Sequence, residues 1–262
     1  MATLLTGLLL KIAMTAGIVV AASIVVERSG PFIGALIASL PTAGGAAMII
    51  LAWEHPPAFI AQSAVGSMVS NALVAVFALS YAALAQRYKL LPSIGGAYVM
   101  WFFAAYLTRF ATFDAWSAAL LNAVVFPLAI LAGSRFRVAG AVRPVRLTAR
   151  DVAWRAGVVT LCVLIVTAAS YSIGSFASGL FAFFPVAMGS FFVILQPRIG
   201  GPAAASVAAH VHAPLIGLGL SLLAVHFLAQ PLGVWWSYLI GLAIGVGWNA
   251  LLWLARRWRM AR

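Results

Sequence analysis

Two segments of the chain, FIGALIASLPTAGGAAMIIL at residues 32–51 and FASGLFAFFPVAMGSFFVIL at residues 176–195, resemble one hydrophobic segment written twice. A shift of 144 positions places Pro41 of the first segment on Pro185 of the second. Duplicated hydrophobic segments that are interrupted in mid-span are a common way of building membrane transporters. The pair therefore predicts a chain made of two related halves.

The composition is that of a protein embedded in a lipid bilayer. Hydrophobic residues make up 65% of the chain, charged residues only 8%, and the mean hydropathy is +1.09. Such a chain would expose too much apolar surface in water. We therefore expect an all-α integral membrane protein. At about 20 residues per span, nine transmembrane helices are expected, at residues 4–26, 31–53, 58–85, 91–109, 114–134, 152–173, 175–196, 202–228 and 232–254.

The positions of the basic residues support that count. With nine spans, nearly all Lys and Arg outside the helices fall on one side, including the loop at 135–150 and the tail at 256–262, and only Arg109 lies opposite. Basic loops are retained in the cytoplasm. We therefore expect a bacterial inner-membrane protein with its N-terminus outside and its C-terminus cytoplasmic. The net charge of +12 then reflects topology and attraction to anionic lipids, with no nucleic-acid partner; a specific acidic partner is the alternative.

The helix count predicts three parts. Residues 1–110 form a first repeat of four helices, residues 111–136 a linking transmembrane helix, and residues 137–262 a second repeat of four helices with a basic cytoplasmic loop and tail. Because one helix lies between the repeats, the second repeat enters the bilayer in the opposite sense. The halves are therefore expected to be inverted repeats.

The two prolines give the first group of candidate site residues. Proline lacks an N–H, so it frees the carbonyl four residues earlier, Ile37 for Pro41 and Phe181 for Pro185, and a freed carbonyl needs another partner inside a membrane. Such a break can form a substrate site, or it can simply kink a packed helix. The residues proposed here for substrate binding are Ser39, Pro41, Thr42, Pro185 and Ser190.

Polar residues inside other spans complete the candidate set. Lys11 in the first span aligns with Arg155; either Lys11 extends its side chain to the interface, or it binds an anion or carbonyl in the core. Ser67 and Asn71 belong to a polar stripe on the third span, which serves either the solute or helix packing. His210 is the candidate proton carrier, because histidine titrates near neutral pH; a structural histidine is the alternative.

The absence of certain motifs limits the function. All four acidic residues lie at predicted helix ends, so carboxylate-driven cation exchange is not expected, and no motif for a metal, a cofactor or catalysis is found. We therefore expect no enzyme and no cofactor, but a small secondary transporter or facilitator for a neutral or anionic solute. The alternative is a non-catalytic assembly or scaffold subunit of a larger membrane complex. A homo-oligomer or a membrane-complex partner is compatible with either function.

One short segment resembles a known family. The sequence IGALIASLPT at residues 33–42, together with Lys11, Gly96 and Trp101, resembles the GlpM-like family of small inner-membrane proteins with about four helices. The resemblance covers the first repeat and, through Pro185 alone, the second. It implies an architecture in which two such units are fused in opposite orientations.

Overall fold

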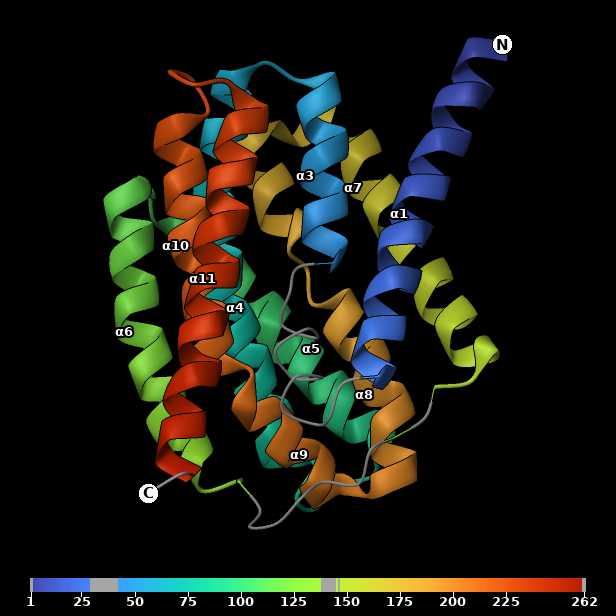
Figure 1. The fold of residues 1–262 in the computed structure, drawn as a ribbon, viewed down its shortest axis with the longest axis vertical. Coiled ribbons are helices and arrows are strands. Elements are labelled where there is room, and N and C mark those ends of the chain that lie inside the picture. The colour runs from blue at the N-terminus through green and yellow to red at the C-terminus, as the bar shows by residue number, and fades with distance from the viewer. Residues whose placement is uncertain (1, 29–41, 138–144, 146, 261–262) are drawn as a thin grey trace.

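The computed structural model describes residues 2–28, 42–137, 145 and 147–260, and their regular structure is entirely helical (Figure 1). A 3₁₀ turn, η1 (Thr108–Phe110), directly follows the α-helix at Leu90–Leu107. The α-helices are α1 (Ala2–Arg28), α3 (Thr42–Glu54), α4 (Pro57–Leu84), α5 (Leu90–Leu107), α6 (Ala115–Ser134), α7 (Ala149–Ala182), α8 (Val186–Ile199), α9 (Gly201–His210), α10 (His212–Leu228) and α11 (Val234–Met260).

Six helical stretches of the described chain are long and apolar enough to cross a membrane. The described apolar parts of α1 and α3, at Leu9–Ala21 and Ala43–Glu54, are shorter. The prediction of an all-helical chain with apolar helices of membrane-spanning length is therefore confirmed. The six stretches are Pro57–Leu84, Leu90–Phe110, Ala115–Ser134, Ala149–Ile199, Gly201–Leu228 and Val234–Trp258.

Helix α4 lies at the centre of the bundle, and α11 lies at its edge. In its most apolar stretch 72% of α4 is buried, against 6% of α11. Helices α5, α6, α7 and α10 all pack against α4. Small residues along α4 let the neighbouring helix backbones approach closely. Close contact matters in a bilayer, because lipid is as apolar as the side chains and helices associate through packing and hydrogen bonds. The remaining apolar surface, such as that of α11, is left for the bilayer.

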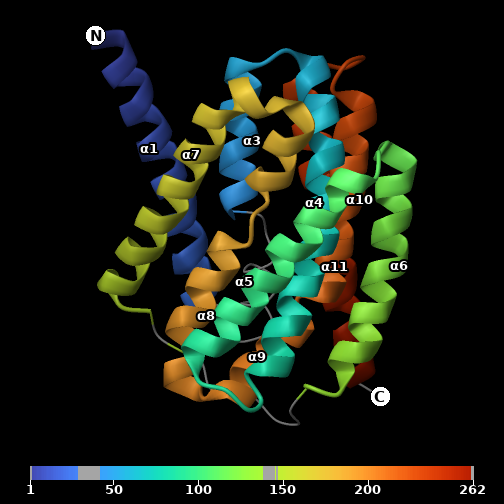
Figure 2. The same ribbon diagram turned by 180° about the vertical axis from the view of Figure 1, so that it is seen from behind.

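The helix boundaries recur at the spacing seen in the sequence. The first residues of two helices lie 144 positions before the first residues of two others, in the pairs Pro57 and Gly201, and Leu90 and Val234; the described part of α3 lies 144 positions before α8. Figures 1 and 2 show that the helices of each pair run in opposite directions: α3 runs up while α8 runs down, α4 runs down while α9 and α10 run up, and α5 runs up while α11 runs down.

The span expected at residues 175–196 is divided in the structure. At its start, Gly174 has φ of +79°, a conformation that favours glycine. The chain reverses there and descends through the bundle (Figure 2). A second interruption follows Ala182, and α8 begins at Val186, directly after Pro185. The break before α8 agrees with the interruption expected at Pro185, because Pro185 cannot donate to the preceding turn.

The carbonyl of Phe181, which Pro185 deprives of its helical partner, finds another partner in the backbone. The backbone N–H of Phe184 donates to it at 3.0 Å, so a tight turn replaces the lost helical bond. The span expected at 202–228 is divided in a similar way, into α9 and α10 at Val211, three residues before Pro214. In the span expected at 31–53, only the part from Thr42 onward lies within the described residues.

Candidate functional site

A cavity of about 240 Å³ lies between α3, α10 and α11. Its volume corresponds to roughly eight molecules of liquid water, enough for a small organic solute. The lining is mostly apolar and also contains the polar side chains of Ser221, Tyr238 and Asn249. The other lining residues are Gly45, Met48, Ile49, Phe183, Pro214, Leu218, Leu222, Val225, Gly241, Leu242, Gly245 and Val246.

The cavity lies where interrupted helices meet. Gly45 is in the first turn of α3, Phe183 follows the last residue of α7, and Pro214 is in the first turn of α10. A Cβ atom added to Gly45 would meet nothing within 4 Å, which shows open space beside α3. Leu242 and Val246 on the α11 wall are 60% and 52% exposed. Leu242 and Val246 therefore line the cavity and are also exposed on the outer surface of the helical bundle.

The three polar side chains that line the cavity each carry an acceptor oxygen. The Tyr238 hydroxyl donates its hydrogen to the Met48 carbonyl at 2.9 Å, and the Ser221 hydroxyl donates to the Gly217 carbonyl at 2.8 Å. Each oxygen keeps lone pairs for a further donor. The Asn249 Oδ1 atom is buried and has no hydrogen-bond partner. A buried acceptor without a partner is costly, so this site favours a ligand that donates a hydrogen bond.

The predicted residues at the two prolines are only partly brought together. Ser39 and Pro41 lie outside the described residues, and Thr42 is the first residue of α3, three positions before Gly45. Pro185 is the residue before α8, and its carbonyl accepts a hydrogen bond from Tyr98 at 3.4 Å. Ser190 donates to the Ala187 carbonyl within its own helix at 2.9 Å.

The polar stripe that contains Ser67 joins α4 to the end of α7. The Ser67 hydroxyl lies 2.9 Å from the Ser63 carbonyl and 3.1 Å from the Gly179 carbonyl, and Ser63 donates to the Ser175 carbonyl at 3.0 Å. A Cβ atom added to Gly66 would overlap the backbone of Phe176. These contacts favour helix packing, the alternative reading of the stripe, over a solute site at Ser67.

Asn71 belongs to a second polar group, formed by α4, α6 and α10. Its amide nitrogen donates to Asn122 Oδ1 at 2.9 Å and to the Leu215 carbonyl at 3.0 Å. The amide nitrogen of Asn122 lies 2.8 Å from the Met68 carbonyl of α4. Asn71 is 1% exposed, and its Oδ1 atom has no hydrogen-bond partner. The cavity lies along a different face of α10, so Asn71 connects helices and does not line the cavity.

Lys11 forms an ion pair with Glu54, the last residue of α3. The cationic group that was expected to reach the interface or an anion is therefore neutralised by a carboxylate of the same chain. At the positions 144 further along the chain stand Arg155 and Arg198.

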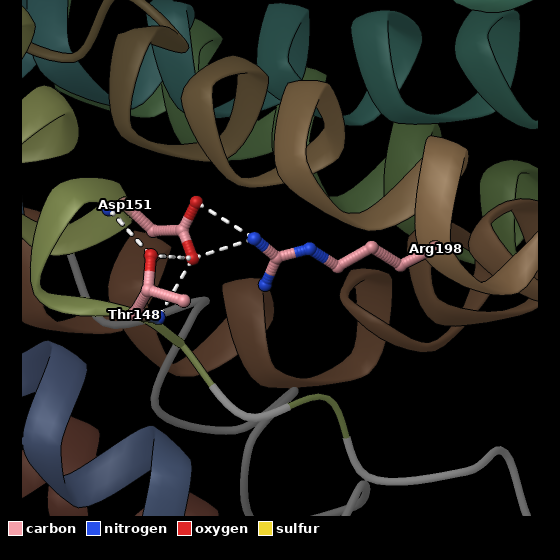
Figure 3. A network of polar contacts seen from close by, with 3 residues as sticks. All are labelled: Thr148, Asp151 and Arg198. Atoms are coloured by element: carbon pink, nitrogen blue, oxygen red, sulfur yellow. Dashed lines mark hydrogen bonds and ion pairs between the residues drawn. The ribbon is translucent and has the colours of Figure 1, made fainter.

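A second ion pair joins α7 to α8, as the first joins α1 to α3. Nη2 of Arg198 lies 2.9 and 2.7 Å from the two carboxylate oxygens of Asp151 (Figure 3). Thr148 and Asp151 also cap the start of α7 by reciprocal hydrogen bonds. Arg155 is buried, and its Cζ atom lies 5.3 Å from the centre of the Phe191 ring.

The two histidines of the interrupted span differ in burial. Nδ1 of His210 lies 2.7 Å from the Ser206 carbonyl, and its side chain is half-buried. His212 is fully buried, with Nδ1 3.2 Å from the Ala209 carbonyl and Nε2 3.2 Å from the Ala75 carbonyl. The structure therefore places His212 deeper than the preferred candidate. A role for His210 in proton coupling stays a prediction.

Sequence reasoning missed the combination of residues that lines the cavity. Pro214 and Asn249 are individually conspicuous in apolar helices, and Gly241 and Gly245 form a pair at four-residue spacing. Such a pair indicates a helix face that another helix approaches closely. Tyr238 and Ser221 carry no local signal, because only the packing of α10 against α11 brings them together.

The described part of the chain is all-helical, and its long apolar helices indicate a membrane-embedded protein. Comparison with known proteins found no matching family model, no similar curated protein and no similar solved structure. The resemblance to the GlpM-like family stays a prediction.

Proposed function

We propose that the protein is a small secondary transporter or facilitator, made of two inverted four-helix repeats around the linking helix α6. The observation that carries this proposal is the cavity between α3, α10 and α11, where the interrupted end of α7 and the interrupted start of α10 meet the described part of α3. Transporters of inverted-repeat architecture typically bind solutes beside discontinuous helices, because interrupted helices expose backbone groups and can rearrange. We place the solute in this cavity.

Three features support the inverted repeats. Corresponding helices begin 144 residues apart and run in opposite directions. Each half has one ion pair between its first and second described helices, Lys11–Glu54 and Asp151–Arg198. Asn71 also donates to Leu215, which is 144 residues away. Equivalent residues contact each other when they lie beside a two-fold axis, so this bond supports an axis between α4 and α10.

The lining of the cavity favours a neutral solute over an anion. Among the described residues that line it, none carries a charge. An ion bound there would lose its water without gaining a partner of opposite charge. The basic residues that suggested an anionic solute do not line the cavity: Lys11 pairs with Glu54, and the Arg155 guanidinium lies against the Phe191 ring.

Osmotic swelling of proteoliposomes tests the transport proposal. The purified full chain is reconstituted, and the swelling rate is measured by light scattering with a panel of small uncharged solutes. We expect at least one solute to enter faster than into protein-free liposomes, and Gly45→Leu to abolish the difference by filling the cavity. Gly157→Leu is the matched control, because Gly157 is exposed on α7 and an added Cβ there meets nothing within 4 Å. Equal rates in all preparations would contradict transport and favour the scaffold function.

A further inference from the structure

We propose that the cavity binds an uncharged, largely apolar molecule that carries a hydroxyl or amide hydrogen-bond donor, and that this molecule enters from the lipid bilayer past α11. The inference names the solute class of the proposed transport site and so rests on the proposed function, but binding is measurable without transport.

The need for a donor follows from the hydrogen atoms already used in the cavity wall. The hydroxyl hydrogens of Tyr238 and Ser221 are engaged with the carbonyls of Met48 and Gly217. Asn249 Oδ1 receives no hydrogen bond. The Tyr238 and Ser221 oxygens therefore act toward a ligand as acceptors, and the buried Asn249 Oδ1 atom becomes a third acceptor when its amide group turns toward the cavity. A ligand with an O–H or N–H group satisfies the buried acceptor, whereas a pure hydrocarbon leaves it without a partner.

The requirement for an apolar, uncharged body follows from the rest of the lining. Side chains such as Met48, Ile49, Phe183, Leu218 and Leu222 cover most of the wall, and no charged side chain lies among the described lining residues. A cation could also donate to the three oxygens, but without a carboxylate nearby its charge would be buried uncompensated. The lining therefore selects against both signs of charge.

Entry from the bilayer follows from the position of the α11 wall. Leu242 and Val246 line the cavity, yet each has more than half of its surface exposed. Both belong to an apolar helix of membrane-spanning length at the edge of the bundle. A molecule dissolved in the acyl chains therefore reaches the cavity past apolar side chains, without contact with the charged ends of the helices.

Binding of four probes of similar shape tests this chemistry. Benzyl alcohol, toluene, benzylammonium and benzoate are titrated against the full chain in detergent, and dissociation constants are obtained from the rise in unfolding temperature. We expect benzyl alcohol to bind about three- to tenfold more tightly than toluene, the effect of one hydrogen bond, and the two ions to give no shift. Equal binding of toluene and benzyl alcohol, or binding of either ion, would overturn the proposal.

Two variants and a control locate the binding. Asn249→Leu should remove the preference for benzyl alcohol over toluene while toluene still binds. Gly45→Leu should abolish binding of both probes, and Gly157→Leu should leave both unchanged, since its side chain lies outside the cavity. Binding that persists in Gly45→Leu, or a preference that persists in Asn249→Leu, would overturn the assigned site.

The binding experiment tests the solute class and the swelling experiment tests transport, so either proposal can be refuted without the other. If the probes bind as expected but no solute enters the liposomes, the binding site is supported and transport is contradicted. Solute entry that Gly45→Leu blocks, together with equal affinity for benzyl alcohol and toluene, would support transport and overturn the inference about solute class.

Discussion

Glycine at the crossing of α4 and α7 lets two helix backbones touch. A Cβ atom added to Gly179 would overlap the backbone of Ser63, and one added to Gly66 would overlap that of Phe176. Both obstacles are main chain, which cannot move aside as a flexible side chain can. The hydrogen bonds from Ser63 and Ser67 to α7 depend on the same close approach.

We therefore expect Gly179→Ala to lower the free energy of unfolding by about 1–3 kcal/mol, the usual cost of overpacking. Thermal unfolding of the purified chain measures the change. Gly157→Ala in the same helix is the control, because its new methyl group meets no neighbour. If the two variants unfolded at the same temperature, the close packing of α4 on α7 would be refuted.

The hydrogen bond between Asn71 and Asn122 joins α4 to α6 in the core. Both side chains are buried, and each makes a further bond to a backbone carbonyl of another helix. In a double-mutant cycle of Asn71→Leu and Asn122→Leu, we expect a coupling energy between about 0.6 kcal/mol, the average for hydrogen bonds between membrane helices, and about 1.7 kcal/mol, the maximum. Chemical denaturation of the four proteins gives this value. Strictly additive effects would show that the two amides do not interact.

The reversal within α7 depends on one glycine. Gly174 combines φ of +79° with ψ of 172°, a region of backbone space that is essentially restricted to glycine. Gly174→Ala should destabilise the protein by about 1–3 kcal/mol, even though an added Cβ would meet nothing within 4 Å. Gly157→Ala should instead stabilise α7 by about 0.5–1 kcal/mol, since alanine is the better helix former. Thermal unfolding compares the two, and stabilisation by both substitutions would exclude the reversal at Gly174.

The start of α6 is capped by a carboxylate whose ionisation matters. The Ser117 hydroxyl and backbone N–H donate to Asp114, and these hydrogen bonds hold the pKa of Asp114 below its ordinary value of 3.8. Because the pKa is lower in the folded state, the ionised carboxylate stabilises the fold at pH values above 3.8, its value in the unfolded chain. This contribution is lost as the pH falls through the pKa of the folded state. Wild type should therefore lose its stability advantage over Asp114→Asn below about pH 4. Unfolding temperatures from pH 7 to pH 3 test this, and a constant difference would refute it.

The two ends of the bundle differ in charge. Figures 1 and 2 place the turns α4–α5 and α8–α9 and the ends of α6 and α11 at one end, and the start of α1 and the turns α3–α4 and α10–α11 at the other. Of the arginines that the structure describes, the first group carries most, among them Arg87, Arg135, Arg198 and Arg256. By the positive-inside rule, we propose that this end faces the cytoplasm.

A reporter fused after Arg262 should therefore be cytoplasmic, and one fused before Met1 should lie outside the membrane. Paired fusions to a phosphatase that is active only outside and to a fluorescent protein that folds only inside measure both ends. An active phosphatase at the C-terminus would refute the orientation, and both termini on one side would refute the odd number of spans.

Composition and hydrophobic run length determined the helices of this protein. A bilayer requires every backbone N–H and C=O to be paired within the segment, so long apolar runs become helices whatever their neighbours are. The interruptions at Gly174 and near Pro185 and Pro214 were also marked locally, because glycine and proline change the backbone at their own positions.

The partners of the polar side chains were decided only by the tertiary structure. The pairing of Lys11 with Glu54, the packing role of Ser67 and the bond from Asn71 to α10 each join residues that are distant in sequence. The cavity likewise exists only because α3, α10 and α11 pack without filling the space beside Gly45. Local pattern reports what a residue can donate or accept, whereas the group it meets depends on how whole helices cross.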